Sequence, residues 1–124
     1  MGWSRFDRWL WRRRFRVADR SMHPTLEPGD RLYVDRTAYR HRPPAVGDIV
    51  VTRDPTLPRR YLVKRVAPDP APVGGGAASP GSLYLLGDDP GASRDSRQFG
   101  AVPLAQVVGR VYRCYDPPER RRDW

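Results

Sequence analysis

Closely spaced proline and glycine residues constrain the fold of this chain more than any other feature of its sequence. The 124 residues include 14 prolines and 11 glycines, and several of them form turn signals such as Pro28-Gly29 and Pro43-Pro44. Because proline cannot continue a helix and glycine favours tight turns, long helices are excluded. The length suits one domain with a modest core.

Five short runs with the alternating apolar pattern of β-strands lie between these turns. They cover residues 31–35, 48–53, 60–67, 82–86 and 106–113. The stretch 68–81, rich in proline, glycine and alanine, indicates a long hairpin loop. Short strands with frequent turns predict a mostly β fold, antiparallel and partly closed. A sheet edge in such a fold can bind an extended peptide as an added strand.

The two ends of the chain differ from this middle part. Residues 1–16 mix arginines with tryptophans at roughly helical spacing, which indicates a short N-terminal helix or arm that packs on the domain or touches lipid. Residues 17–115 form the predicted folded domain, and the basic residues 116–124 are expected to form a disordered tail. No run approaches the roughly 18–20 apolar residues that span a bilayer. We therefore expect a cytoplasmic protein with at most peripheral membrane contact.

Charge and cysteine content exclude several classes of function. The formal net charge of +9 suits acidic partners, but the arginines form no recognisable binding module, so we expect no nucleic-acid partner. Cys114 is the single cysteine, which excludes an internal disulfide and a cysteine-based metal cage. We expect neither a metal nor another cofactor.

Lys64 is the only lysine among 23 basic residues, so the other 22 are arginines. An arginine cannot be deprotonated in a protein, whereas a desolvated lysine amine can. Within the run 60–67, period-two alternation places Leu62, Lys64 and Val66 on one apolar face. Burial on that face lowers the pKa of the Lys64 amine, as a general base near neutral pH requires.

Two further segments supply hydroxyl and charged groups. Ser21 precedes a Met-His-Pro-Thr turn and a predicted strand, where a turn or helix-cap serine is the alternative. The loop 87–100 is dense in turn formers and charges. Within it, Ser93 offers a hydroxyl that can orient a neutral amine, and Asp95 and Arg97 are expected to form an ion pair that rigidifies the loop.

Four motifs in this chain have the order and spacing found in type I signal peptidases. They are Ser21-Met22-His23-Pro24-Thr25-Leu26, Gly47-Asp48-Ile49-Val50, Lys64-Arg65-Val66, and Gly87-Asp88-Asp89 through Ser93-Arg94-Asp95-Ser96-Arg97. The resemblance covers residues 17–113 and implies a serine endopeptidase with a Ser–Lys dyad on an antiparallel β fold. By this resemblance Ser21 is the nucleophile and Lys64 the general base. Ser93 would orient the lysine, while Asp95 and Arg97 would hold the loop.

The chain departs from the family pattern in three ways. We expect no N-terminal membrane anchor, the insert after the lysine run is short, and Asp19 stands two residues before the serine, where relatives often have Gly or Ser. In the first two features the chain resembles the branch of the family that matures nickel-type superoxide dismutase. This resemblance implies the proform of that enzyme as the substrate. The alternative substrate is a secretory leader, cleaved as by a general type I signal peptidase.

Two other functions compete with the Ser–Lys protease. A Ser–His hydrolase would use His23 or His41, although neither has an evident carboxylate partner in the sequence. A non-catalytic binding module would use the basic surface to dock an anionic partner, which intact Ser21 and Lys64 argue against. Cys114 is expected to be a packed core thiol and not a nucleophile.

Overall fold

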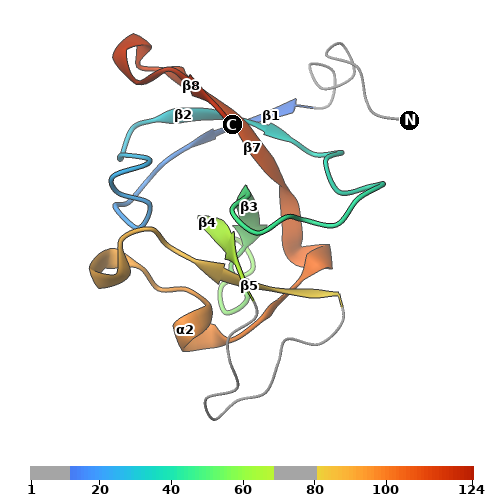
Figure 1. Cartoon of the computed structure of the whole chain (residues 1–124). Helices are drawn as coiled ribbons and strands as arrows, with labels where there is room; N and C mark the ends of the chain where they lie inside the picture. Colours follow the sequence, from blue (N-terminus) through green and yellow to red (C-terminus); the bar gives the residue numbers. More distant parts are fainter. Residues whose placement is uncertain (1–11, 69–80) are drawn as a thin grey trace.

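One antiparallel sheet organises the computed structural model, which describes residues 12–68 and 81–124 (Figure 1). Its strands are β1 (Arg12–Arg16), β2 (Arg31–Asp35), β3 (Ile49–Arg53), β4 (Tyr61–Ala67), β5 (Ser82–Leu86), β6 (Val102–Pro103), β7 (Val107–Asp116) and β8 (Arg122–Asp123). Their order is β1-β2-β7-β3-β4-β5-β6, with β8 on β7. The prediction of a mostly β, antiparallel fold is confirmed, and the described strands form an open sheet.

The long strand β7 joins the two halves of the sheet. It pairs with β2 along one part of its length and with β3 along another, and register shifts mark both pairings. Gly109 makes the close approach of β2 and β7 possible, because a Cβ at this position would lie 2.3 Å from the carbonyl oxygen of Asp35. The strand β4 then continues the sheet from β3 towards β5.

Two apolar clusters form the core. The larger one contains Val17, Met22, Leu26, Leu32, Val34, Ile49, Val51, Val111 and Cys114, and the smaller one Val50, Val66, Leu85 and Val102. Met22 and Leu26 lie in the loop between β1 and β2, and both are almost completely buried. Burying a side chain of this size stabilises the fold by about 1.5–3 kcal/mol. The loop that carries Ser21 is therefore anchored to the core.

Helical structure is limited to single turns in the part of the chain that the structure describes. These are η1 (Pro90–Ala92), α2 (Ser96–Phe99), η2 (Leu104–Gln106) and η3 (Pro118–Arg120). None of the helices within residues 12–68 and 81–124 has the length and apolar character needed to cross a bilayer.

Residues 12–16 of the predicted N-terminal helix or arm form the strand β1 on the edge of β2, so the helix alternative is wrong there and these residues form an arm packed on the domain. Five charged and aromatic residues with four arginines give no apolar alternation, so the strand signal was absent from the sequence. The rest of that segment, residues 1–11, and most of the predicted hairpin loop, residues 69–80, lie outside the described residues.

The C-terminal segment is ordered, contrary to the expectation of a disordered tail. It forms η3 and β8, and the Arg120 side chain bonds the buried carboxylate of Asp30 with Nε at 2.8 and 3.0 Å. The backbone N–H of Trp124 donates to the carbonyl oxygen of Tyr112 at 3.0 Å. A run of charges looked solvated because its partner, Asp30, lies 90 residues away in the sequence.

Candidate active site

Lys64 lies in the middle of β4 with its side chain pointing into the protein. Burial alternates along the strand, so Leu62, Lys64 and Val66 are buried, as the period-two pattern predicted. Lys64 is only 2% exposed. Desolvation therefore lowers the pKa of its amine, while the nearby charges of Asp19 and Asp95 oppose that shift. A neutral amine becomes accessible at lower pH than in a free lysine.

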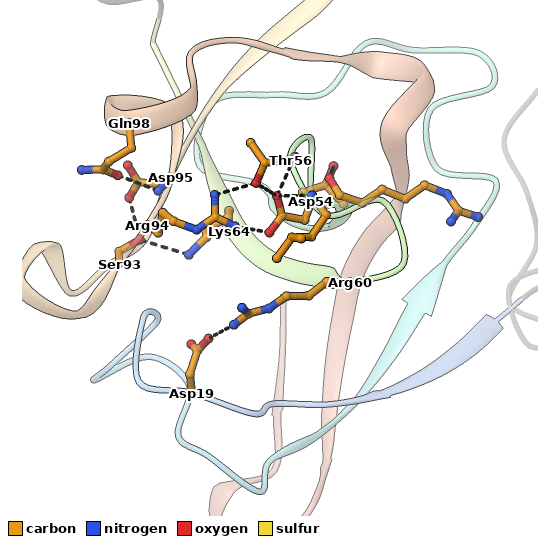
Figure 2. A network of polar contacts seen from close by, with 12 residues as sticks. Asp19, Asp54, Thr56, Arg60, Lys64, Ser93, Arg94, Asp95 and Gln98 are labelled. Atoms are coloured by element: carbon orange, nitrogen blue, oxygen red, sulfur yellow. Dashed lines mark hydrogen bonds and ion pairs between the residues drawn. The ribbon is translucent and has the colours of Figure 1, made fainter.

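The Ser93 hydroxyl connects Lys64 to Asp95 (Figure 2). The Nζ of Lys64 lies 3.0 Å from the Oγ of Ser93, and that Oγ donates to Oδ2 of Asp95 at 2.6 Å. A hydroxyl has one proton, and an ionised carboxylate can only accept. Ser93 must therefore accept an N–H from Lys64. One N–H of the amine is fixed in this way, and the lone pair of the neutral form points elsewhere.

Asp95 is a buried carboxylate that organises the loop around Ser93. It accepts hydrogen bonds from the backbone N–H of Gly87 at 2.8 Å and from Arg97 at 3.0 Å (Nε) and 2.6 Å (Nη2). It also caps α2, with Gln98 completing a capping box. Burial works to raise the pKa of Asp95, but the hydrogen bonds from Arg97 and Ser93 outweigh it and the pKa falls below its ordinary range. The expected Asp95–Arg97 ion pair is present.

Ser21 lies in the loop between β1 and β2 and is 5% exposed. Its carbonyl oxygen accepts the backbone N–H of Asp89 at 2.9 Å. Gly87 permits this contact, because a Cβ there would lie 2.6 Å from the Ser21 oxygen and 2.1 Å from the Ser93 hydroxyl oxygen. The backbone of Ser21 and the hydroxyl of Ser93 therefore meet at one glycine.

Asp88 connects the loop that carries Ser21 to β4. It accepts the hydroxyl of Thr25 at 2.6 Å and two guanidinium N–H groups of Arg65, each at 2.8 Å. Such a bidentate pair fixes geometry as well as adding energy. Asp88 belongs to a motif that the sequence singled out, but its role as a connector was not predicted from the sequence.

A second connection joins the β3–β4 turn to the Ser93 loop. The guanidinium of Arg94 pairs with the buried carboxylate of Asp54 and donates to the Thr56 hydroxyl at 3.1 Å (Figure 2). Asp54 also accepts the backbone N–H of Thr56 at 2.9 Å. Nothing in the local sequence marks Asp54, because its partner lies 40 residues further along the chain.

Asp19 lies beside Ser21 and near the amine of Lys64. Its Oδ1 accepts the backbone N–H of Ser21 at 3.0 Å, and its Oδ2 lies 3.6 Å from the Arg60 guanidinium (Figure 2). Burial works to raise the pKa of Asp19, but the hydrogen bonds from Ser21 and the charges of Lys64 and Arg60 lower it overall. The backbone N–H of Ser21 is thus bonded to a carboxylate.

The alternative nucleophiles and bases have different surroundings. His23 pairs through Nδ1 with Glu27, so the expectation that neither histidine has a carboxylate partner is wrong for His23. The i,i+4 spacing of that pair could have revealed it. His41 lies exposed in the loop before β3. Cys114 is 1% exposed, and burial raises the pKa of its thiol, which disfavours the thiolate.

Comparison with known proteins gives a consistent set of relatives. A family model described as signal peptidase, peptidase S26, matches residues 6–72 and 70–115. The mitochondrial ATP-independent inner membrane protease subunits 1b and 1a of Arabidopsis thaliana are 37% and 33% identical, over 73% and 80% of this chain. The probable signal peptidase I-1 of Synechocystis is 28% identical over 81% of the chain. The chain spans 62%, 67% and 69% of the lengths of these three relatives.

Proposed function

The chain belongs to the signal peptidase family, peptidase S26, and we propose that it is a serine endopeptidase with Ser21 as nucleophile and Lys64 as general base. One observation carries the proposal. The buried amine of Lys64 is hydrogen-bonded to Ser93, and Ser93 lies against the same glycine as the backbone of Ser21. A desolvated lysine in such a place has the properties of a base and not of a surface charge.

The reaction follows the general logic of acyl transfer. Neutral Lys64 takes the proton of the Ser21 hydroxyl as Oγ bonds to the carbonyl carbon of the scissile peptide. The tetrahedral oxyanion collapses, the C–N bond breaks, and the leaving amine takes the proton from Lys64. Lys64 then takes a proton from a water whose oxygen adds to the acyl carbon. The bond between that carbon and Oγ breaks, and Lys64 returns the proton to Ser21. The backbone N–H of Ser21 stabilises the oxyanion in both halves of the reaction.

Ser93, Asp95 and Arg97 are proposed to act through Lys64. Because Ser93 donates its proton to Asp95, it accepts an N–H of the lysine. We infer that this leaves the lone pair of the neutral amine free to face Ser21. Arg97 pairs with Asp95, which weakens, without removing, the effect by which that carboxylate raises the pKa of Lys64. These three residues are positioning residues, and their loss should lower the rate without removing the nucleophile.

The substrate is proposed to bind as an added strand along β4. Val66 makes its backbone hydrogen bonds to the segment just before β3. Because the backbone groups of an antiparallel strand alternate in direction, those of Tyr61 and Val63 point the other way. In the described residues the register of β5 on β4 covers residues 65–67. The N-terminal half of β4 thus offers an edge to an extended precursor peptide beside Lys64.

Among precursors, we propose the proform of a nickel-type superoxide dismutase as the substrate, and secretory leaders as the alternative. The first rests on the sequence resemblance alone, whereas the named relatives are an inner membrane protease and a signal peptidase. Purified protein would be incubated with each precursor, and the new N-termini identified by mass spectrometry. Cleavage of the secretory precursor alone would refute the superoxide dismutase assignment and leave the protease assignment intact.

The protease itself is tested with two substitutions. Ser21→Ala and Lys64→Arg should each abolish cleavage, because a guanidinium cannot accept the serine proton. Arg59→Lys is the control, since it changes an exposed basic residue of the same loop region and should leave the rate unchanged. Retention of a tenth of wild-type activity in Lys64→Arg would exclude the lysine base. Loss of activity in His23→Ala, with Lys64→Arg active, would favour the His23–Glu27 pair.

Cleavage is proposed to occur in the cytoplasm, with at most peripheral contact with an anionic membrane. The net charge of +9 favours such contact, and salt screens it. After lysis without detergent, the protein should appear in the supernatant or leave the membrane pellet in high salt. Release by detergent alone would contradict this proposal.

A further inference from the structure

The oxyanion donor of the proposed protease already has a partner in this structure. The backbone N–H of Ser21 donates to Oδ1 of Asp19 at 3.0 Å. An oxyanion formed at the scissile carbonyl needs the same N–H at about 2.7–3.1 Å. An oxygen of the Asp19 carboxylate therefore occupies the direction in which the oxyanion of the substrate must form.

Asp19 is charged where it lies. Although its partial burial works to raise its pKa, hydrogen bonds from Ser21 and the charges of Lys64 and Arg60 lower that pKa overall. Two anions cannot share one N–H donor, since like charges at contact distance repel each other strongly in a partly dry site. The carboxylate must leave the amide before the tetrahedral intermediate can form.

Arg60 is placed to receive the departing carboxylate. Its guanidinium lies 3.6 Å from Oδ2 of Asp19, the oxygen that does not bond the Ser21 amide. Arg60 stands on the turn before β4, opposite the segment that carries Asp19 (Figure 2). The Arg60 and Asp19 side chains are 53% and 48% exposed, so both have room to change rotamer.

We propose that Asp19 is a self-inhibitory group that a productive substrate displaces from the Ser21 amide, and that Arg60 holds it in the displaced position. This inference rests on the proposed function, because it assigns the step at which the oxyanion donor becomes available. It adds Asp19 and Arg60 as residues that set the rate of acylation, with opposite signs. The uncomplexed enzyme is thereby partly blocked against adventitious peptides.

A purely structural role makes the opposite prediction. An aspartate that accepts the N–H two residues ahead forms a common turn, and such a turn could simply hold Ser21 in place. In that case Asp19→Ala would lower the rate, and Asp19→Asn would rescue it because the amide oxygen still accepts. If Asp19 inhibits, Asp19→Ala raises the rate most and Asp19→Asn raises it less, since a neutral acceptor is displaced more easily than a charged one.

The experiment measures kcat and KM for one cleaved precursor peptide in five variants. Asp19→Ala is expected to raise kcat about tenfold, the scale of a charge-assisted hydrogen bond weakened by partial exposure. Arg60→Gln should lower kcat about fivefold, while Arg59→Gln, the exposed neighbour, should not change it. In the double variant Asp19→Ala/Arg60→Gln the effect of Arg60→Gln should vanish, because its partner is gone. Asp19→Asn completes the set.

A peptide aldehyde provides a second measurement. The Ser21 hydroxyl adds to its carbonyl and forms a hemiacetal whose oxygen needs the Ser21 amide. Asp19→Ala should therefore lower the inhibition constant of the aldehyde by the same factor by which kcat rises. The corresponding peptide alcohol forms no such bond, and its affinity should not change.

Three results would overturn the inference while leaving the protease intact: a lower rate in Asp19→Ala that Asp19→Asn restores, an Arg60→Gln effect that persists without Asp19, or an unchanged aldehyde constant. If the folded wild-type protein cleaves no precursor and neither does any variant, the proposed function fails and this inference fails with it.

Discussion

Lys64 and Ser21 are held in place by different kinds of interaction. Around Lys64 the contacts are buried hydrogen bonds and ion pairs, centred on Asp95, which is completely buried. Around Ser21 the loop is anchored by the apolar side chains of Met22 and Leu26, and its polar neighbour Asp19 is half exposed. Lys64 thus has a fixed, dry environment that lowers its pKa. Ser21 is anchored from the core side, and the charged side chains beside it are exposed enough to change rotamer.

Gly87 lies between the Ser93 hydroxyl, which contacts Lys64, and the backbone of Ser21. Substitution of Gly87 should therefore have the largest effect on cleavage. In Gly87→Ala the added Cβ would lie 2.1 Å from the Ser93 hydroxyl oxygen and 2.6 Å from the Ser21 carbonyl oxygen. We expect a loss of cleavage of more than about a hundredfold, because a displacement of 1 Å is enough to cost that much. Gly91→Ala is the matched control, since its nearest contact would be an ordinary 3.6 Å. Equal rates in both variants would show that the two sides are not coupled through Gly87.

The surroundings of Lys64 should lose stability when the buried charge of Asp95 is removed. Asp95→Asn removes the charge that pairs with Arg97 and leaves one acceptor oxygen where Asp95 has two, and it should cost about 3–5 kcal/mol in the free energy of unfolding. Asp123→Asn breaks an exposed pair with Arg113 and should cost less than about 1 kcal/mol. Denaturant unfolding of both variants measures the difference. Similar costs would contradict the contrast between buried and exposed pairs.

Protonation of Asp95 at low pH should destabilise the protein in the same way as its substitution by asparagine. The pKa of Asp95 is lower in the folded protein than its unfolded value of about 3.9. The folded state therefore binds fewer protons, and the contribution of Asp95, present above about pH 4, is lost as the pH falls through the folded pKa. Asp95→Asn should show a weaker fall in melting temperature below about pH 4. An identical acid profile would contradict the assigned pKa direction.

The loop that carries Ser21 should be destabilised when the apolar side chain of Met22 is removed. Met22→Ala should cost about 2–4 kcal/mol, because Met22 is 1% exposed and its removal leaves a cavity beneath the Ser21 loop. Met22→Leu preserves most of the volume and should cost less than about 1.5 kcal/mol. Cleavage at a temperature where both variants are folded should fall in Met22→Ala alone. Unchanged cleavage in Met22→Ala would show that the anchor does not position the nucleophile.

Replacing Lys64 should have the smallest effect on the free energy of unfolding. Lys64 should also have the clearest effect on how stability and kcat/KM depend on pH. Because burial lowers its pKa, the unfolded chain binds more protons than the folded one between the two pKa values, and stability rises with pH in that window. Lys64→Met should therefore raise stability by about 1–2 kcal/mol at neutral pH while abolishing cleavage. In the wild type, kcat/KM should rise with a midpoint well below the roughly 10.4 of a free lysine.

Ser93→Ala extends the pH experiment. It should lower kcat/KM at every pH without abolishing cleavage, because the amine loses its orienting partner and keeps its burial. A rise of kcat/KM near 6.5 that disappears in His23→Ala would instead identify a histidine base.

Local patterns in the sequence were enough to predict the class of fold and the burial of Lys64. Turn residues and alternation are properties of neighbouring residues, so the runs that became β2, β3, β4, β5 and β7 were visible. The apolar face that carries Lys64 followed from the same alternation. The order of four motifs, together with that lone lysine, indicated the family.

The polar connections of the site were decided by the tertiary structure alone. With 22 arginines in the chain, the sequence does not say which guanidinium meets which carboxylate. Arg94 pairs with Asp54 and Arg120 pairs with Asp30, at separations of 40 and 90 residues in the sequence. The position of Asp19 against the Ser21 amide likewise depends on how the loop closes on the core. Strand alternation is fixed by local backbone geometry, whereas ion-pair partners are fixed by which side chains the folded sheet brings together.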